Sequence, residues 1–192
     1  MCYNADDHTL PDYENPISIR YVELCGCVSE NKHSGKGISH MKQHRDYPVA
    51  VVTKKGARSV EQGHPWIYDT EVISLEDGWE NGGLADAVDE KGKYLGTGLI
   101  SERSKIRIRL ISRNANDRFD QDFFRRRIRY AWEYRKTVMG SDIGCCRVIF
   151  GEADQFPGLT VDRFGDVLVT QTLSVGMERY KDVIFPLLHQ VL

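Results

Sequence analysis

The sequence predicts an α+β protein in which a small β-rich domain is followed by a segment that mixes helices and strands. Residues 48–113 contain several short runs with period-two alternation, separated by turn residues, and this pattern is typical of a small barrel or sandwich. Residues 120–139 show the spacing of apolar side chains expected for a helix. A strand pattern, a hairpin pattern and a second helical pattern follow up to residue 192, so the second segment combines both kinds of element.

The β-rich domain is predicted to open with a β-branched strand over residues 49–54. One helical turn is expected over residues 57–62. Pro65 disfavours helix at the residue before it, so a loop precedes a second strand over residues 66–73. Trp66 stands at the start of this strand, and its large ring is expected to pack inside the barrel.

The rest of this domain is predicted to be a hairpin and a final strand. Residues 84–89 and 93–100 alternate in polarity and can pair across the short connection at residues 90–92. The strand over residues 105–112 places apolar residues on one face and basic residues on the other. The apolar set is Ile106, Ile108 and Leu110, and the basic set is Lys105, Arg107 and Arg109.

The second segment begins with a long helix that Asp120 can cap and that runs to about residue 139. Its apolar side is predicted to consist of Phe124, Ile128, Ala131 and Val138. A strand at residues 147–150 comes next. Residues 159–163 and 167–173 are then expected to pair as a hairpin, and a last helix begins near Met177.

The composition is that of an ordinary globular protein, with 41% hydrophobic residues. Its apolar runs are far shorter than the roughly 20 residues that span a bilayer. Five cysteines at irregular spacing and a polar start without signal-peptide features favour a cytoplasmic protein without disulfides. Residues 1–46 show no periodicity and are predicted to be disordered or a spurious N-terminal extension. The expected domains therefore cover residues 47–115 and 116–192.

The charge of the chain is unevenly distributed, although its net value is only −2. Residues 48–102 hold five basic and ten acidic residues, a local charge of −5, whereas residues 103–136 hold twelve basic and four acidic residues, a local charge of +8. A basic surface of this kind attracts polyanions such as nucleic acids, although a solvated helix face and a charged strand would give the same count.

Basic residues of this surface, together with three basic residues at and after the end of the first predicted strand, are the candidate RNA-binding residues. Alternate residues of a strand lie about 7 Å apart on one face, a little more than the phosphate spacing of RNA. Tyr130 and Trp132 are available to stack on bases. The candidates are Lys54, Lys55, Arg58, Arg103, Lys105, Arg107, Arg109, Arg113, Arg125, Arg126 and Arg129.

Other chemistry is less well supported by the sequence. The Gly96-Thr97-Gly98 run resembles a cofactor loop, but it leads into a strand and not into the helix that such a loop needs, so it is interpreted as a bulge or barrel bend. Glu152 and Asp154 are interpreted as capping and turn residues. Zinc binding is a weaker hypothesis because Cys25 and Cys27 are too closely spaced for a usual zinc site. Its ligands would come from Cys25, Cys27, His33, His40 and His44.

Two sets of motifs resemble known domains. The first set resembles a PUA domain, a small RNA-binding pseudo-barrel, and consists of Lys54-Lys55-Gly56, Gly63-His64-Pro65-Trp66-Ile67-Tyr68, Gly92-Lys93, Leu95-Gly96-Thr97-Gly98, Ser101 and Ile106-Arg107-Ile108-Arg109. The second set is the stretch from Arg147 to Asp166. It resembles the central domain of the large-subunit rRNA cytosine-C5 methyltransferases that use S-adenosylmethionine.

The resemblance implies a PUA-like pseudo-barrel followed by part of an α+β linker domain, with ribosomal RNA as the partner. In that family, the S-adenosylmethionine loop and the catalytic cysteine belong to a third, Rossmann-like domain. We therefore expect the substrate-recognition portion of such an enzyme, a fragment inactive by itself, with no catalytic, cofactor-binding or metal-binding residue in this chain. A homodimer is left open.

Two alternatives to this interpretation remain. One is a freestanding PUA-type RNA-binding adaptor with no enzymatic activity, and the other is a zinc-dependent regulator that uses residues 25–44. The coding sequence downstream of Leu192 tests the first alternative, because a continuing reading frame with a glycine-rich cofactor loop would support the enzyme. Metal analysis of the purified protein decides the second.

Overall fold

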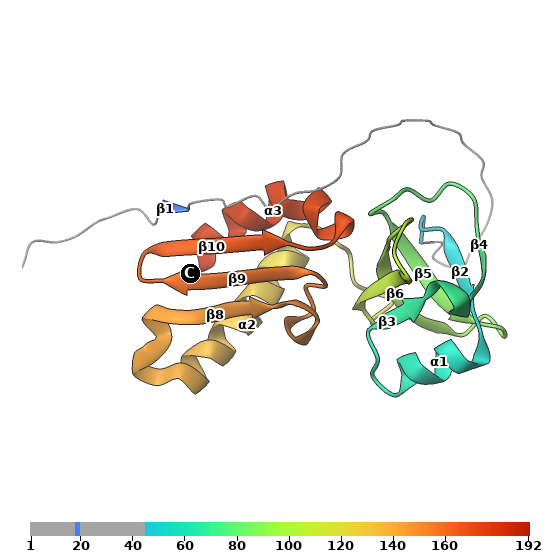
Figure 1. Ribbon diagram of the computed structural model, residues 1–192, viewed down its shortest axis with the longest axis horizontal. Helices are drawn as coiled ribbons and strands as arrows, with labels where there is room; N and C mark the ends of the chain where they lie inside the picture. The colour runs from blue at the N-terminus through green and yellow to red at the C-terminus, as the bar shows by residue number, and fades with distance from the viewer. Residues whose placement is uncertain (1–17, 20–44) are drawn as a thin grey trace, which may run out of the picture.

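The computed structural model describes residues 18–19 and 45–192, which form two units side by side (Figure 1). The cysteines and histidines of the zinc hypothesis lie outside the described residues, as does nearly all of the segment predicted to be disordered. The α+β class predicted from the sequence is confirmed, with a curled β-sheet followed by a unit of sheet and helices. The domain boundaries at residues 47 and 116 stay a prediction.

The first unit is built on a six-stranded sheet in the order β3-β7-β6-β5-β2-β4. Its strands are β2 (Val49–Val52), β3 (Trp66–Tyr68), β4 (Val72–Leu75), β5 (Leu84–Asp89), β6 (Tyr94–Ile100) and β7 (Ile106–Ser112). The pair β2 and β5 is parallel, and the other neighbours are antiparallel. The predicted hairpin corresponds to β5 and β6, so this local assignment is confirmed.

The glycines of β6 allow this sheet to bend. The register between β6 and β7 shifts at Thr97 and Gly98, as a bulge requires. A Cβ atom on Gly98 would lie 2.5 Å from Cγ2 of Ile108 and 2.6 Å from the carbonyl oxygen of Arg109, so only glycine fits there. The interpretation of this run as a bend inside a strand is confirmed.

Two elements of the first unit differ from the sequence prediction. The helix α1 spans Lys54–Glu61 and starts earlier than expected, because the Thr53 hydroxyl accepts a hydrogen bond from the amide of Gly56 and caps it. The expected strand over residues 66–73 is divided by a 3-10 turn at Asp69–Glu71.

The packing predicted for Trp66 is wrong. Its neighbour Ile67 points into the barrel and is fully buried, and because successive side chains of a strand alternate, Trp66 points away from the barrel and is half-buried. The barrel core consists of Ala50, Val52, Ala57, Val60, Ile67, Ala85, Ala87, Leu95, Ile100, Ile108 and Leu110.

The second unit is a four-stranded sheet with two helices against one face (Figure 1). Its strands are β8 (Cys145–Phe150), β9 (Leu159–Phe164) and β10 (Val167–Thr172), and the short β1 (Ser18–Ile19) pairs with β10 in parallel. The helices are α2 (Gln121–Met139) and α3 (Val175–Val191). Short 3-10 turns at Gly140–Gly144 and Gly151–Asp154 flank β8.

Local signals in the sequence located these elements well. The Asp120 carboxylate accepts the amide hydrogen of Phe123 at 2.9 Å, and the Ser174 hydroxyl caps α3 in the same way. One residue of the predicted apolar side of α2 is misplaced: Val138 is exposed, and Met139 is the residue that packs against the core. The largest buried residues of this core are Phe123, Phe124, Phe156, Ile128, Ile149, Leu159 and Leu168.

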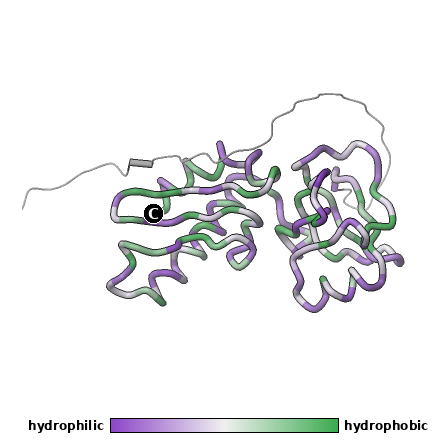
Figure 2. Tube along the Cα trace, in the orientation of Figure 1, coloured by the Kyte–Doolittle hydropathy of each residue, from purple (hydrophilic) through white to green (hydrophobic). Residues whose placement is uncertain are grey.

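The two units share part of one core. Leu99 of β6 and Ile111 of β7 belong to the first sheet, yet both pack in the core of the second unit. Gly176 of α3 lies so close to Leu99 that an added Cβ would approach its side chain to 2.6 Å. Figure 2 shows that hydrophobic residues follow the strands of both units, whereas the segment around α1 is mostly hydrophilic. No helix among the described residues is both long and apolar enough to cross a membrane.

Candidate nucleic-acid interface

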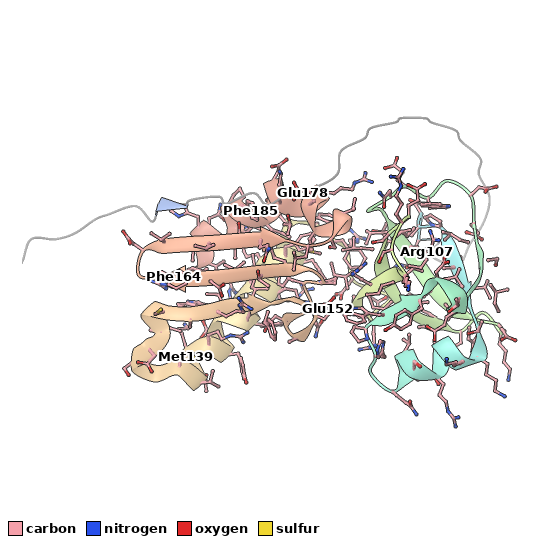
Figure 3. All side chains as sticks on the ribbon, in the orientation of Figure 1. Arg107, Met139, Glu152, Phe164, Glu178 and Phe185 are labelled. Carbon is pink, nitrogen blue, oxygen red and sulfur yellow. The ribbon has the colours of Figure 1, made fainter. Side chains whose placement is uncertain are left out.

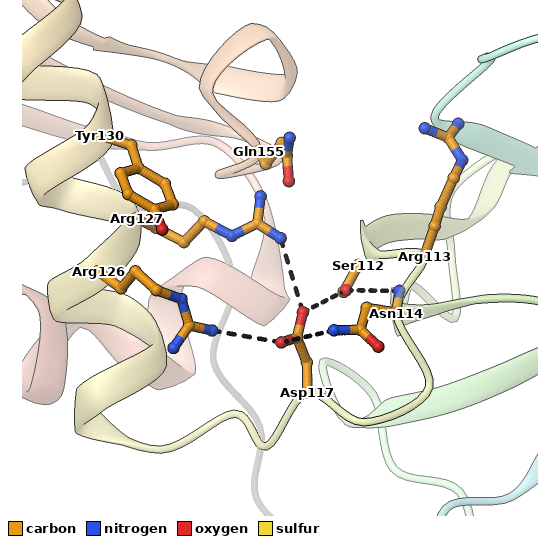
Figure 4. Close-up of a pocket in the computed structure, with 8 residues that line it drawn as sticks. All are labelled: Ser112, Arg113, Asn114, Asp117, Arg126, Arg127, Tyr130 and Gln155. Atoms are coloured by element: carbon orange, nitrogen blue, oxygen red, sulfur yellow. Dashed lines mark hydrogen bonds and ion pairs between the residues drawn. The ribbon is translucent and has the colours of Figure 1, made fainter.

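A cleft of about 530 Å³ opens where the first unit passes into α2 (Figure 4). Its walls come from three places: the loop after β7, the first half of α2, and the turn before β9. The residues that line it are Ser112, Arg113, Asn114, Asp117, Arg126, Arg127, Tyr130 and Gln155.

Asp117 is the hub of the hydrogen bonds in this cleft. Its carboxylate accepts a hydrogen bond from Arg126 at 3.2 Å and lies 3.8 Å from the guanidinium of Arg127. The Ser112 hydroxyl and the Asn114 amide donate to the same carboxylate at 2.6 and 3.4 Å. One carboxylate thus faces two guanidinium groups, and Arg113 at the rim adds a third, so the cleft has an excess of positive charge.

Arg126 and Arg127 of α2 both pack against the aromatic ring of Phe123. The guanidinium carbons of Arg126 and Arg127 lie 5.6 and 5.0 Å from the ring centre of Phe123, within the range of cation–π contact. Burial lowers the pKa of Arg127, and the neighbouring Asp117 opposes this shift. Arginine remains charged under such shifts, because its ordinary pKa lies far above neutral pH. Arg127 is therefore a fixed cation, whereas the side chain of Arg126 is 44% exposed.

Exposed aromatic rings continue along α2 beside the cleft. Tyr130 is 62% exposed and Tyr134, one turn further, is 59% exposed. The guanidinium of Arg135 covers Tyr134 at 5.1 Å. Trp132, which the sequence suggested for stacking on bases, is instead buried in the core with Arg163 over its ring at 5.1 Å. That suggestion is corrected, and Tyr130 is the ring that reaches the cleft.

The basic face predicted for β7 is largely occupied by contacts within the first unit. Arg107 pairs with Asp69 through Nε at 2.8 Å and donates to the carbonyl of Glu102 at 3.0 Å (Figure 3). Arg109 donates to the Ser101 hydroxyl at 3.1 Å, and burial lowers its pKa. Their contact with RNA stays a prediction.

The other candidates fall into separate groups. Arg113 and Arg126 lie in the cleft, and Arg129 is exposed one turn further along α2. Arg125 pairs with Asp122 at 2.6 Å and points towards α3, where it reaches Gln190. Exposed candidates away from the cleft lining are Lys54, Lys55 and Arg58 on α1, and Arg103 and Lys105 before β7.

Five cleft residues were not among the candidates from the sequence: Ser112, Asn114, Asp117, Arg127 and Gln155. Arg127 continues the run Arg125-Arg126 and could have been included from its charge alone. Gln155 comes from a loop 38 residues further along the chain than Asp117, and no local pattern connects the two.

Comparisons with known proteins agree with the geometry of both units. The model of the PUA-like domain matches residues 50–113. The ribosomal RNA large subunit methyltransferase I of Klebsiella pneumoniae is 36% identical over 146 residues, which cover 76% of this chain and 36% of the relative. The protein of the same name from Salmonella typhi is 39% identical over 133 residues, with 69% and 33% covered. The chain is homologous to ribosomal RNA large subunit methyltransferase I.

This homology confirms the resemblance seen in the sequence. It covers only part of the relatives. The chain spans about a third of the length of the curated relatives it matches. A solved structure from Streptococcus mutans, assigned to the SAM-dependent methyltransferases, superposes with a TM-score of 0.65 at 19% identity. The match covers 74% of this chain and 37% of that protein, and it supports the fold alone.

Proposed function

We propose that this chain is the RNA-binding, substrate-recognition portion of a ribosomal RNA large-subunit methyltransferase that modifies cytosine at C5 with S-adenosylmethionine. The observation that supports this proposal most directly is a cationic cleft with an exposed tyrosine, set beside a PUA-like domain in a homologue of these enzymes. Ribosomal RNA is the proposed partner, and the cytoplasm is the proposed location.

The charges around the cleft support RNA as the partner. Within the described residues, Arg113 and Arg129 form no ion pair, so their charges are free to meet phosphates. Arg113 keeps one hydrogen bond, to the carbonyl of His64, which leaves most of its donors open. Release of counterions from RNA would then supply most of the affinity.

The glycine run of β6 does not fit the methyl donor. Gly96 and Gly98 lie inside β6 and pack against β7, so their backbone does not form the glycine turn before a helix that binds a nucleotide cofactor. We therefore assign RNA recognition to residues 45–192 and derive no step of methyl transfer from them.

The test of this function is the salt dependence of binding to unmodified large-subunit ribosomal RNA. The double variant Arg113→Gln/Arg129→Gln removes two unpaired charges. A matched control, Lys93→Gln/Arg179→Gln, also removes two charges, but both of these residues pair with carboxylates outside the cleft. Each lost phosphate contact should reduce the slope of log affinity against log salt by about 0.7–0.9.

We expect the slope to fall in the Arg113/Arg129 variant and to stay near that of the wild type in the control. Equal slopes in all three proteins would remove the cleft from the RNA interface. A third variant, Arg107→Gln/Arg109→Gln, tests the basic face of β7. The loss of its internal contacts should mainly lower the melting temperature.

A further inference from the structure

The cleft lies open to solvent and is large enough for one nucleotide. Its volume of about 530 Å³ falls within the range typical of pockets that enclose a small molecule, roughly 300–1,000 Å³. One nucleotide that has left its helix fits in a space of this size. Specific recognition of RNA commonly uses such unstacked bases, which stack on aromatic side chains.

Tyr130 offers the surface on which a base can stack. Its ring is 62% exposed and lies beside Arg127 at the wall of the cleft (Figure 4). Within the described residues, the ring of Tyr130 forms no aromatic contact and its hydroxyl forms no hydrogen bond, so the ring is open to a base. Stacking on an exposed tyrosine accepts any base, because every base has a π-face.

The guanidinium groups can accept the phosphate of the same nucleotide. Arg126 is half-exposed, so its side chain can turn from Asp117 towards a phosphate at the mouth of the cleft. Arg113 stands on the opposite wall, where Figure 4 shows its guanidinium pointing away from Asp117. Arg127 stays with the carboxylate, since it is only 14% exposed. With Arg127 paired to Asp117, the guanidinium groups of Arg113 and Arg126 leave an excess of positive charge that can bind a phosphodiester.

Gln155 adds an exposed polar side chain to the wall of the cleft. Among the described residues, it is the one non-glycine residue with a positive φ, at 62° with ψ at 34°. This left-handed conformation disfavours a side chain, and strain of this kind often lies at functional sites. The side-chain amide lines the cleft and forms no hydrogen bond within the described residues, so its donor and its acceptor are both open.

We propose that the cleft formed by Arg113, Arg126, Tyr130 and Gln155 binds one unpaired nucleotide of an RNA chain. The base stacks on Tyr130, the phosphate meets Arg113 and Arg126, and the amide of Gln155 bonds to an edge of the base. This proposal rests on the proposed RNA-binding function and deepens it. It adds discrimination between bases to an interface that phosphates alone would leave insensitive to sequence.

The test compares binding of the full chain to a short single-stranded RNA and to the duplex of the same sequence. Tyr130→Leu removes the ring, and its exposed position leaves the core intact. Tyr134→Leu is the matched control one turn away, and Tyr130→Phe restores the ring. We expect Tyr130→Leu to weaken single-strand binding about 5- to 100-fold and to leave duplex binding unchanged. Tyr130→Phe and Tyr134→Leu should bind like the wild type.

A second comparison uses single strands that differ at one base, tested with the wild type and with Gln155→Gly. Loss of discrimination in Gln155→Gly supports the edge contact, and unchanged discrimination overturns it. If Tyr130→Leu binds single strands as the wild type does, the nucleotide site is overturned. If the wild type still binds ribosomal RNA in a salt-dependent manner, the proposed function stands without this site. Failure of the wild type to bind any RNA would overturn both proposals.

Discussion

The indole nitrogen of Trp66 donates a hydrogen bond of 2.8 Å to the carboxylate of Glu152, and this bond joins the PUA-like unit to the second unit. Glu152 lies in the turn after β8, at the junction of the units (Figure 3). The negative charge of Glu152 also acts on Arg109. It opposes the lowering of the pKa of Arg109 by burial. The cleft opens near the same junction, so a fixed orientation of the two units also fixes the walls of the cleft.

Trp66→Phe should lower the free energy of unfolding by about 1–2 kcal/mol. A hydrogen bond to a charged group contributes about 1.5–3 kcal/mol, and partial exposure of both partners reduces this value. Glu152→Gln keeps an acceptor oxygen and should cost less. Denaturant unfolding of the two single variants and of the double variant measures the coupling. A Trp66→Phe variant as stable as the wild type would show that this bond does not hold the units together.

Leu99 provides a second link between the units, through packing. It lies on β6, is 1% exposed, and packs in the core of the second unit, so Leu99→Ala should cost about 2–5 kcal/mol. Gly176→Ala should also destabilise the protein, because its Cβ would lie 2.6–2.8 Å from Cβ, Cδ1 and Cγ of Leu99.

A double-mutant cycle checks this contact. Leu99→Ala removes two of the three clashing atoms, so Gly176→Ala should cost less in that background than in the wild type. Strictly additive free energies of unfolding would show that Leu99 and Gly176 do not pack on each other.

The sequence predicted those parts of the fold that depend on neighbours along the chain. Asp120 caps α2 through the amide of Phe123, three residues away, and the β5–β6 hairpin closes over a short connection. Trp66 was misplaced for the opposite reason. Alternation along a strand separates Trp66 from Ile67, but which of them points into the barrel depends on the pairing with β7, where Ile67 stands opposite Ile108, 41 residues away.

The same distinction holds for the candidate site. Local charge density identified Arg113 and Arg126, because they belong to a basic stretch. It could not show that Arg107 is paired, since its partner Asp69 stands 38 residues earlier. It also could not place Gln155 in the same cleft as Asp117, because the two residues lie 38 positions apart in the sequence.

Asp86 should give the stability of the protein a particular pH dependence. The residue is 7% exposed, and burial raises the pKa of its carboxyl, although the hydrogen bond from Thr97 and the charge of Arg45 act against this shift. The folded state therefore favours the protonated acid more than the unfolded chain does. This contribution is fully present below the ordinary aspartate pKa of about 3.9 and is lost as the pH rises through the higher pKa of the folded state.

Asp86→Asn removes the titration but keeps a group of the same shape. The difference in free energy of unfolding, wild type minus variant, should fall as the pH rises from about 3.9, and it should level off above the pKa of Asp86 in the fold. Denaturant unfolding at a series of mildly acidic pH values measures this difference. A difference that rises with pH would mean that the charge of Asp86 is stabilised by Arg45 more than burial disfavours it.

Gln155→Gly should make the protein more stable, although it shortens a side chain that lines the cleft. Glycine adopts a φ of 62° without strain, and relief of such strain is worth about 1–2 kcal/mol. The greater freedom of glycine in the unfolded chain removes about 0.5–1 kcal/mol of this gain. The net increase in the free energy of unfolding should therefore lie between about 0 and 1.5 kcal/mol.

Gln62→Gly is the matched control, because Gln62 ends α1 with an ordinary φ of −78° and offers no strain to relieve. This variant should be destabilised by about 0.5–1 kcal/mol. Equal losses in both variants would mean that position 155 is not strained. A Gln155→Gly variant that is more stable than the wild type and unable to discriminate between bases is the remaining outcome. In that case Gln155 lowers the stability of the protein and contributes to RNA recognition, a combination that is common at functional sites.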